Sequence, residues 1–122
     1  MTASILTVDD SPSIRVALKI ALTNAGYSVA EAGNGAEGIE KAKGSAFDLI
    51  ITDLNMPVMD GLTMIEELRR MPDQTGVPIV FLTTESDEGM KARAKAAGAT
   101  GWLTKPFDPE QLVRIAKKVL GR

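Results

Sequence analysis

Five short apolar runs alternate along the chain with five segments whose apolar residues recur at helical spacing. The runs place large apolar residues on consecutive positions, which is typical of strands buried on both faces of a parallel sheet. The predicted strands are residues 5–8, 27–32, 48–52, 78–82 and 100–103. Each of the helical segments follows one strand and keeps its apolar residues on one face, as expected of helices that pack on a sheet.

Capping and breaking residues separate these elements. Ser11 followed by Pro12 has the form of a helix N-cap with proline at the first helical position, and Asn34 can cap the second helix. Gly98 can end the fourth helix. Strands that alternate with helices predict an α/β fold in which helices cover both faces of a parallel sheet. Right-handed crossovers place the carboxyl ends of all strands on one edge, where such sheets bind ligands.

The composition fits one domain spanning residues 1–122, with 44% hydrophobic residues, 25% charged residues and a net charge of −2. This charge gives no basic field that would attract nucleic acid, and no apolar run approaches the ~20 residues of a membrane span. The absence of cysteine and histidine excludes disulfides, imidazole metal sites and Ser-His or Cys-His catalysis. The N-terminus lacks the features of a signal peptide. We therefore expect a cytoplasmic protein that ends with its last helix and has no attached output domain.

Polar side chains follow the predicted strands at the expected ligand edge. They are Asp9 and Asp10 after the first strand, Asp53 after the third, Thr83 after the fourth and Lys105 after the fifth. At ~4 Å and a surface-like dielectric, each pair of carboxylates repels by about 4 kcal/mol, so a cluster of three usually binds a cation. Because the ligands are oxygens only, a hard ion such as Mg²⁺ is favoured.

The same side chains suit the transfer of a phosphoryl group. A carboxylate can act as the nucleophile and form an acyl phosphate, and a lysine opposite the metal can neutralise the phosphoryl oxygens. A threonine hydroxyl can donate to one of those oxygens and so report that the group is present. Phosphoryl transfer requires mainly positioning and charge neutralisation, and this set of residues supplies both.

Four motifs along the chain, taken together, resemble the two-component receiver domain, and most of all the single-domain chemotaxis response regulators of the CheY type. They are Val8-Asp9-Asp10-Ser11, Asp53-Leu54-Asn55-Met56-Pro57 with Met59-Asp60-Gly61, Thr83-Thr84, and Lys105-Pro106-Phe107. Each motif is weak alone, but in this order at the ends of these strands they are specific, and they cover essentially the whole chain. The resemblance implies the flavodoxin-like or CheY-like fold, a five-stranded parallel sheet of order 2-1-3-4-5 with five helices on both faces.

The resemblance also implies how the acidic residues act. Asp53 is the phosphoacceptor, and Asp10 and Asp53 ligate Mg²⁺ directly. The backbone carbonyl of Asn55 is the third protein ligand, and Asp9 acts mostly through a metal-bound water. Asn55 and Glu85 occupy positions that flank the attacking water in this family, and their polar and acidic types suggest a short-lived signal.

Two further residues are assigned by the resemblance, and a third departs from it. Thr83 and Lys105 are expected to bind the phosphoryl oxygens, and the peptide bond between Lys105 and Pro106 is expected to be cis. Three residues before the lysine the family usually carries Tyr or Phe, which rotates inward when the threonine moves toward the phosphoryl group. This chain has Trp102 there, which is either fixed against the sheet edge or a bulkier switch on the output surface formed by the last two helices and the last strand.

The predicted function is therefore a single-domain response regulator that catalyses only its own phosphorylation and dephosphorylation and is not otherwise an enzyme. Because the chain has no histidine, a sensor histidine kinase or a phosphotransfer protein must supply the phosphoryl group. The phosphorylated form signals by binding a downstream target protein. A chemotaxis role with the flagellar motor switch as target is favoured, and a phosphate sink or phosphorelay shuttle is the alternative. We expect a monomer with no nucleic-acid or membrane partner.

Other classes of protein fit the residues less well. A flavodoxin-like cofactor binder needs a phosphate-cradling loop after the first strand, where Asp9 and Asp10 would repel the cofactor. A metal-dependent phosphohydrolase would place its nucleophile after the first strand and add a cap domain, whereas Asp53 follows the third strand. A phosphorylation-independent adaptor usually lacks one acidic residue or the lysine. Each site residue taken singly also has an ordinary role, as a helix cap, a turn residue, a surface lysine or a strand threonine.

Overall fold

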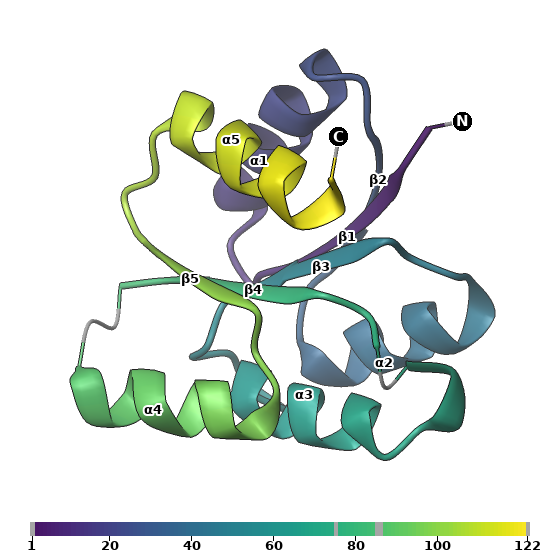
Figure 1. Cartoon of the computed structure of the whole chain (residues 1–122), viewed down its shortest axis with the longest axis vertical. Helices are drawn as coiled ribbons and strands as arrows, with labels where there is room; N and C mark the ends of the chain where they lie inside the picture. The colour runs from purple at the N-terminus through teal and green to yellow at the C-terminus, as the bar shows by residue number, and fades with distance from the viewer. Residues whose placement is uncertain (1, 75, 85–86, 122) are drawn as a thin grey trace.

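The computed structural model describes residues 2–74, 76–84 and 87–121, which form a parallel sheet between two layers of helices (Figure 1). The strands are β1 (Ser4–Val8), β2 (Ser28–Ala32), β3 (Leu49–Thr52), β4 (Ile79–Thr83) and β5 (Gly101–Thr104). Their order across the sheet is β2-β1-β3-β4-β5, which confirms the predicted order. Every predicted strand is present, and its ends differ from the prediction by no more than one residue.

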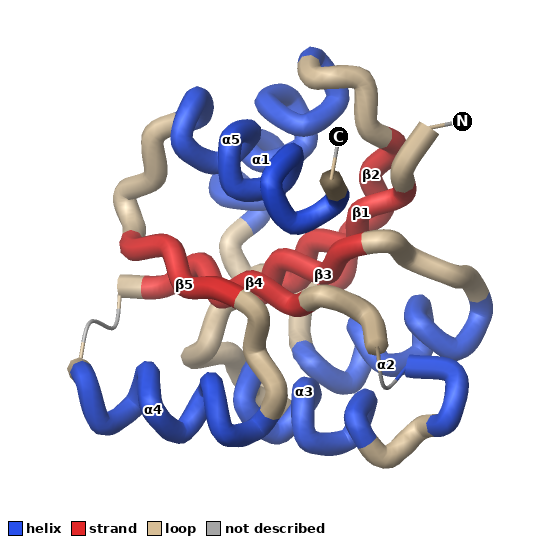
Figure 2. The backbone as a smooth tube through the Cα atoms, in the orientation of Figure 1, coloured by secondary structure: helices blue, strands red, loops and turns tan. Residues whose placement is uncertain are grey.

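The helices lie on both faces of the sheet, as predicted. They are α1 (Pro12–Asn24), α2 (Gly35–Gly44), α3 (Gly61–Arg69), α4 (Glu88–Ala97) and α5 (Pro109–Leu120), with a short 3-10 helix, Pro72–Gln74, after α3. Figure 2 shows α1 and α5 on one face and α2, α3 and α4 on the other. The 3-10 helix was not predicted, because three residues are too few to give a periodic pattern. Among the described residues, no helix is long and apolar enough to cross a membrane.

Side-chain caps start the first two helices where the sequence predicts them. The Ser11 hydroxyl accepts a hydrogen bond from the Ile14 N–H at 3.4 Å, and the Asn34 side chain accepts from the Glu37 N–H at 2.9 Å. Gly98 ends α4 with a φ of 110°, a conformation that glycine adopts easily because it has no Cβ. Helix α1 therefore begins directly after the acidic pair, and its N-cap is Ser11 rather than either aspartate.

The sheet divides the core into two apolar clusters. Leu6 and Phe81 belong to the cluster under α2, α3 and α4, whereas Ile5 and Leu82 belong to the cluster under α1 and α5. Neighbouring strand residues such as Ile5 and Leu6 point to opposite faces, and both are fully buried. The continuous apolar runs of the sequence thus correspond to strands that are covered by helices on both faces. The two apolar clusters hold these strands in place and so position the strand ends.

The loop between β3 and α3 is held close to the end of β3 by Gly61. The Gly61 N–H donates to the Leu54 carbonyl at 2.8 Å. A Cβ at this position would overlap the Asp53 carbonyl and press on the Phe81 ring, so only glycine allows this approach. The first residue of α3 is thereby packed against the backbone that carries Asp53.

Candidate functional site

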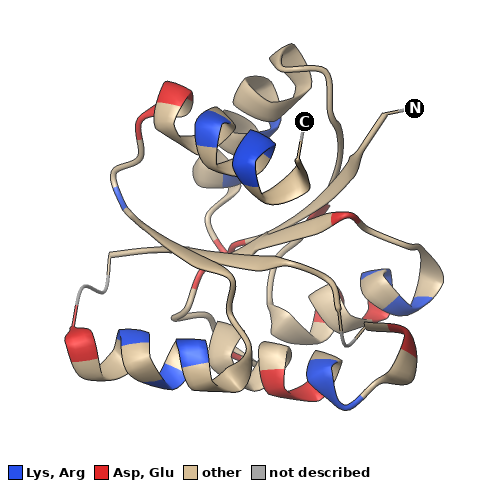
Figure 3. Ribbon diagram, viewed as in Figure 1, with Lys and Arg blue, Asp and Glu red and all other residues tan. Residues whose placement is uncertain are grey.

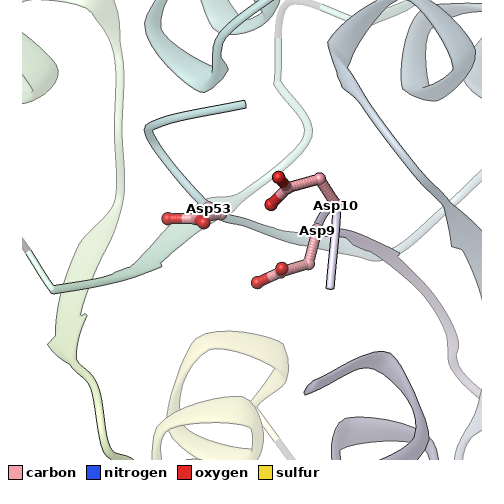
Figure 4. A group of neighbouring side chains, drawn as sticks. All are labelled: Asp9, Asp10 and Asp53. Atoms are coloured by element: carbon pink, nitrogen blue, oxygen red, sulfur yellow. The ribbon is translucent and has the colours of Figure 1, made fainter. Parts of the chain in front are cut away.

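The carboxyl ends of β1 and β3 bring three acidic side chains together. Asp9 and Asp10 directly follow β1, and Asp53 directly follows β3. One carboxylate oxygen from each residue lies within 4.8 Å of the others, and Figure 4 shows the three side chains side by side at the strand ends. The convergence that the sequence predicts for these residues is therefore present in the structure.

Asp9 is the most buried of the three, with only 1% of the residue exposed. Its Oδ1 accepts a hydrogen bond from the Ser11 N–H at 2.9 Å, and its Oδ2 accepts one from Lys105 Nζ at 2.8 Å. Its own N–H donates to the Ala32 carbonyl on β2 at 3.1 Å. A buried carboxylate is stable only when its oxygens are paired in this way.

Asp53 and Asp10 differ in how much of their bonding capacity is used. Asp53 is buried, its Oδ1 accepts from the Leu54 N–H at 2.7 Å, and its Oδ2 accepts from Lys105 Nζ at 3.2 Å. Asp10 is exposed and forms no hydrogen bond or ion pair with another described residue. The Asp10 carboxylate is therefore able to bind a ligand without first breaking a contact within the described chain.

Lys105 is the cation of the site. Its side chain is 13% exposed and its Nζ contacts both Asp9 and Asp53. Burial lowers the pKa of Lys105, but the hydrogen bond to Asp9 and the nearby charge of Asp53 raise it, and the net shift is upward. The lysine is thus held as an ammonium ion against the two buried carboxylates. The predicted cis peptide bond between Lys105 and Pro106 is confirmed.

Thr83 and Asn55 both lie at or just after the carboxyl ends of strands, but they differ in burial. Thr83 is the last residue of β4, fully buried, and its carbonyl accepts a hydrogen bond from the Lys105 N–H at 2.8 Å. Asn55 is exposed in the loop that follows Asp53. The roles predicted for both residues stay predictions. Glu85 lies outside the described residues.

Trp102 lies in the edge strand β5 and is partly buried. Its ring packs on Phe81, with the ring centroids 5.6 Å apart and a tilt of 47° between the ring planes. Lys91 Nζ lies 5.9 Å from the centroid of the Trp102 ring. Hollows of about 280 and 370 Å³ border it on either side, one against α4 and the other against α5. Figure 3 shows basic residues on both of these helices. Trp102 therefore sits within a surface that is hollowed and flanked by basic residues.

Arg15 is a site residue that sequence reasoning missed. Its Nη1 donates to the backbone carbonyl of Asp9, and its Nε donates to Glu31 Oε1 at 3.3 Å. The only signal in the sequence is an arginine one helical turn after the Ser11 cap, which by itself is an ordinary surface position. The side-chain direction that makes this contact depends on the packing of α1 on the sheet.

A parallel α/β sheet that gathers three carboxylates and a bridging lysine at its carboxyl edge defines the class of signalling domains that are phosphorylated on aspartate. The family model of the response regulator receiver domain matches residues 5–117. The chain belongs to this family.

Curated relatives differ in how much of their length this chain covers. Protein PilH of Pseudomonas aeruginosa is 34% identical over 97% of this chain and 98% of its own length. The chain spans 48% of the transcriptional regulatory protein ResD of Bacillus subtilis, which is 37% identical over 97% of this chain. It spans 58% of the probable transcriptional regulator ycf29 of Porphyra purpurea, which is 34% identical over the whole chain. The family thus includes proteins of this size and proteins about twice as long.

Solved structures with the same fold include two informative receivers. The chemotaxis protein CheY4 of Vibrio cholerae is 44% identical, with a TM-score of 0.94 over 98% of this chain and 99% of that protein. The receiver domain of the sensor histidine kinase PA1611 of Pseudomonas aeruginosa is 30% identical, with a TM-score of 0.91 over the full length of both chains. The PA1611 structure holds a magnesium ion coordinated in its active site cleft.

Proposed function

We propose that this receiver domain is a phosphorylation switch in which Asp53 accepts the phosphoryl group with the help of Mg²⁺. The observation that carries the proposal is the contact of Lys105 Nζ with both Asp9 and Asp53, beside a third carboxylate within 4.8 Å. The proposal is supported because this arrangement would supply a nucleophile, a cation for the phosphoryl oxygens and a set of metal ligands.

The donors at the site fit a magnesium ion. They are carboxylate and carbonyl oxygens, which hard divalent cations prefer, and the chain has no histidine or cysteine to favour a softer metal. We assign direct ligation to Asp10, Asp53 and the Asn55 carbonyl, with Asp9 acting through a metal-bound water. The Asp10 carboxylate, which has no hydrogen-bond or ion-pair partner among the described residues, and the magnesium ion in the PA1611 receiver support this assignment. When bound, the ion neutralises negative charge on the phosphoryl oxygens.

The chemistry of the switch is a displacement at phosphorus. A carboxylate oxygen of Asp53 forms a bond to phosphorus while the bond from phosphorus to the imidazole nitrogen of the donor breaks, and the electron pair stays on that nitrogen. Lys105, already 3.2 Å from Asp53 Oδ2, pairs with a phosphoryl oxygen, and the Thr83 hydroxyl donates to another. In the later hydrolysis step a water oxygen bonds to phosphorus while the bond from phosphorus to the Asp53 oxygen breaks, and the electron pair stays on the carboxylate. The protons of the water leave with the inorganic phosphate.

The partners of the switch follow from the same residues. A histidine kinase or phosphotransfer protein must donate the phosphoryl group, since this chain contains no histidine. The output is a phosphorylation-dependent contact with a target protein through the surface around Trp102, and the domain acts as a monomer in a chemotaxis pathway, with the flagellar motor switch as the candidate target. The 44% identity to CheY4 over nearly its whole length supports the chemotaxis role.

A phosphorelay or phosphate-sink role is the second candidate, favoured by the match to the receiver of a sensor histidine kinase. The two roles predict different fates for the phosphoryl group. A chemotaxis switch keeps it on Asp53 until hydrolysis and binds its target meanwhile. A relay domain passes it on to a histidine of a second protein, so radiolabel would move from the phosphorylated domain to a cognate phosphotransfer protein.

Incubation with Mg²⁺ and acetyl phosphate tests the core of the proposal. Intact-mass measurement should show the gain of one phosphoryl group by the wild type and none by Asp53→Asn. The matched control is Asp60→Asn, which changes a carboxylate in the same loop while asparagine can still accept the Thr63 N–H bond that caps α3. An unchanged mass of the wild type under saturating donor, or labelling of Asp53→Asn equal to wild type, would overturn it.

A further inference from the structure

We infer that Arg15 is a positioning residue for the acidic site: it fixes the peptide group between Asp9 and Asp10 and so aims the Asp10 carboxylate. The inference rests on the proposed function of that site as a metal-dependent phosphoacceptor. It starts from the hydrogen bond that Arg15 Nη1 donates to the Asp9 carbonyl, a contact between α1 and the loop that carries both aspartates.

The Asp9 carbonyl belongs to the peptide group that joins Asp9 to Asp10. The other polar groups of Asp9 are already held, because its N–H donates to Ala32 and its two carboxylate oxygens accept from Ser11 and Lys105. The bond from Arg15 holds the last of them. With the peptide plane fixed, the nitrogen and Cα of Asp10 are held in place, so the direction of its side chain depends only on rotation about the Asp10 N–Cα bond and on the side-chain torsions.

This bond matters most for Asp10, because nothing else among the described residues holds the Asp10 carboxylate by a hydrogen bond or ion pair. A ligand that is exposed and unpaired keeps its direction only through its backbone. Groups that orient a metal ligand in this way typically change metal affinity by about 10–100-fold when they are removed. Arg15 therefore supports the backbone of the one proposed carboxylate ligand that no other described residue holds by a side-chain contact.

The guanidinium of Arg15 is itself anchored. Its Nε donates to Glu31 Oε1 on β2 at 3.3 Å, and its side chain is 21% exposed. A Cβ on Gly33 would lie 3.7 Å from Arg15 Nη1, so the head group fits closely against the loop after β2. Two donors of one planar group thus reach two acceptors, one on β2 and one in the loop after β1, which a lysine ammonium on a flexible stem does not reproduce.

Lys19 provides a matched comparison on the same helix. Its Nζ lies 3.8 Å from Glu31 Oε2, its side chain is 55% exposed, and within the described part of the chain it forms no hydrogen bond or ion pair with the acidic site. Lys19→Met therefore removes one positive charge and one contact with Glu31, as Arg15→Met does, but leaves the Asp9 carbonyl bonded.

The direction in which the Mg²⁺ affinity changes on mutation distinguishes a positioning role of Arg15 from an effect of its positive charge. If Arg15 acted only through its positive charge, its removal would make the site more negative and would tighten Mg²⁺ binding. If Arg15 acts by fixing the peptide, Arg15→Met weakens Mg²⁺ binding although the local charge becomes more favourable. Arg15→Lys keeps the charge, so a change in its affinity also reports on geometry.

Isothermal titration calorimetry with Mg²⁺ tests the inference. We expect Arg15→Met to raise the dissociation constant about tenfold, Arg15→Lys to raise it by a smaller factor, and Lys19→Met to leave it within about twofold of wild type. Arg15→Lys retains the fold if Arg15→Met does not. An unchanged or tighter constant in the Arg15 variants, or an equal loss in Lys19→Met, would overturn the inference.

A second measurement on the metal-free protein separates this inference from the proposed function. The Ser11 N–H donates to Asp9 Oδ1, and we expect its hydrogen exchange to be several-fold faster in Arg15→Met than in wild type and unchanged in Lys19→Met. Wild-type protein that binds no Mg²⁺ would refute the proposed function, whereas unchanged exchange in Arg15→Met would refute the positioning role.

Discussion

Replacing Lys105 with methionine should destabilise the metal-free protein by about 3 kcal/mol. Lys105 Nζ lies 2.8 Å from Asp9 Oδ2 and 3.2 Å from Asp53 Oδ2. At an effective dielectric of about 20 these attractions amount to about 6 and 5 kcal/mol, whereas carboxylates 4.8 Å apart repel by about 3.5 kcal/mol for each pair. One lysine therefore offsets roughly the whole mutual repulsion of the three acids.

The net loss of stability is smaller than these gross attractions. Removing one partner of a buried ion pair usually costs about 3–5 kcal/mol, and the open side of this cluster at Asp10 places the value at the lower end. Methionine has a similar length and no charge, so it keeps the packing of the stem. Mg²⁺ should stabilise the variant more than the wild type, because in the wild type the ion shares Asp9 and Asp53 with the lysine.

Urea unfolding in EDTA, repeated in excess Mg²⁺, measures both effects. Lys118→Met is the control, since it removes an exposed lysine of α5 remote from the acidic cluster. The reasoning would be refuted by a Lys105→Met variant as stable as wild type in EDTA. It would also be refuted if Mg²⁺ stabilised the two proteins equally.

Three other measurements probe the loop, the lysine and the output face. Val58→Asn should raise the free energy of unfolding in urea by about 1 kcal/mol, because Val58 has a φ of 70° and is 84% exposed, and asparagine tolerates this conformation. Burial lowers the pKa of Lys105 but its carboxylate partners raise it above 10.5 overall. The stability that the Lys105 ammonium gives the protein is therefore fully present below the pKa of lysine in the unfolded chain and is lost as the pH rises through the folded pKa. Thermal unfolding at increasingly alkaline pH should therefore show a steeper fall of stability with pH in wild type than in Lys105→Met. Trp102 fluorescence should change when Mg²⁺ and beryllofluoride bind, and a flat titration beside proven binding would show that Trp102 is static.

The fold could be predicted almost completely from the sequence, for physical reasons that particular elements show. Strands such as β3 and β4 are buried on both faces, so each one appears in the sequence as a continuous apolar run. Helix α1 starts where Ser11 can accept an N–H bond, and α4 ends at a glycine with positive φ. The convergence of Asp9, Asp10 and Asp53 followed from parallel strands whose carboxyl ends share one edge.

The contacts that depend on side-chain direction could not be predicted. Nothing in the sequence shows that Lys105 bridges Asp9 and Asp53, because the bridge depends on how far β5 extends relative to β1 and β3. The bond from Arg15 to the Asp9 carbonyl depends on the rotation of α1 about its axis and on the rotamer of a long side chain. Such contacts are set by tertiary packing rather than by local sequence pattern.

Trp102 stands where the family usually has Tyr or Phe, and its contact with Phe81 bears on how this larger side chain can move. Phe81 pairs with Trp102 in the register of β4 and β5, and its fully buried ring lies 5.6 Å from the indole, centroid to centroid. The Phe81 ring also lies close to Gly61, which packs on the Asp53 carbonyl. Because protein interiors are close-packed, movement of the indole toward the core would displace the buried Phe81 ring. We therefore expect a shift of the loop after Asp53 to reach Trp102 through Phe81, and the change in Trp102 fluorescence measures whether it does.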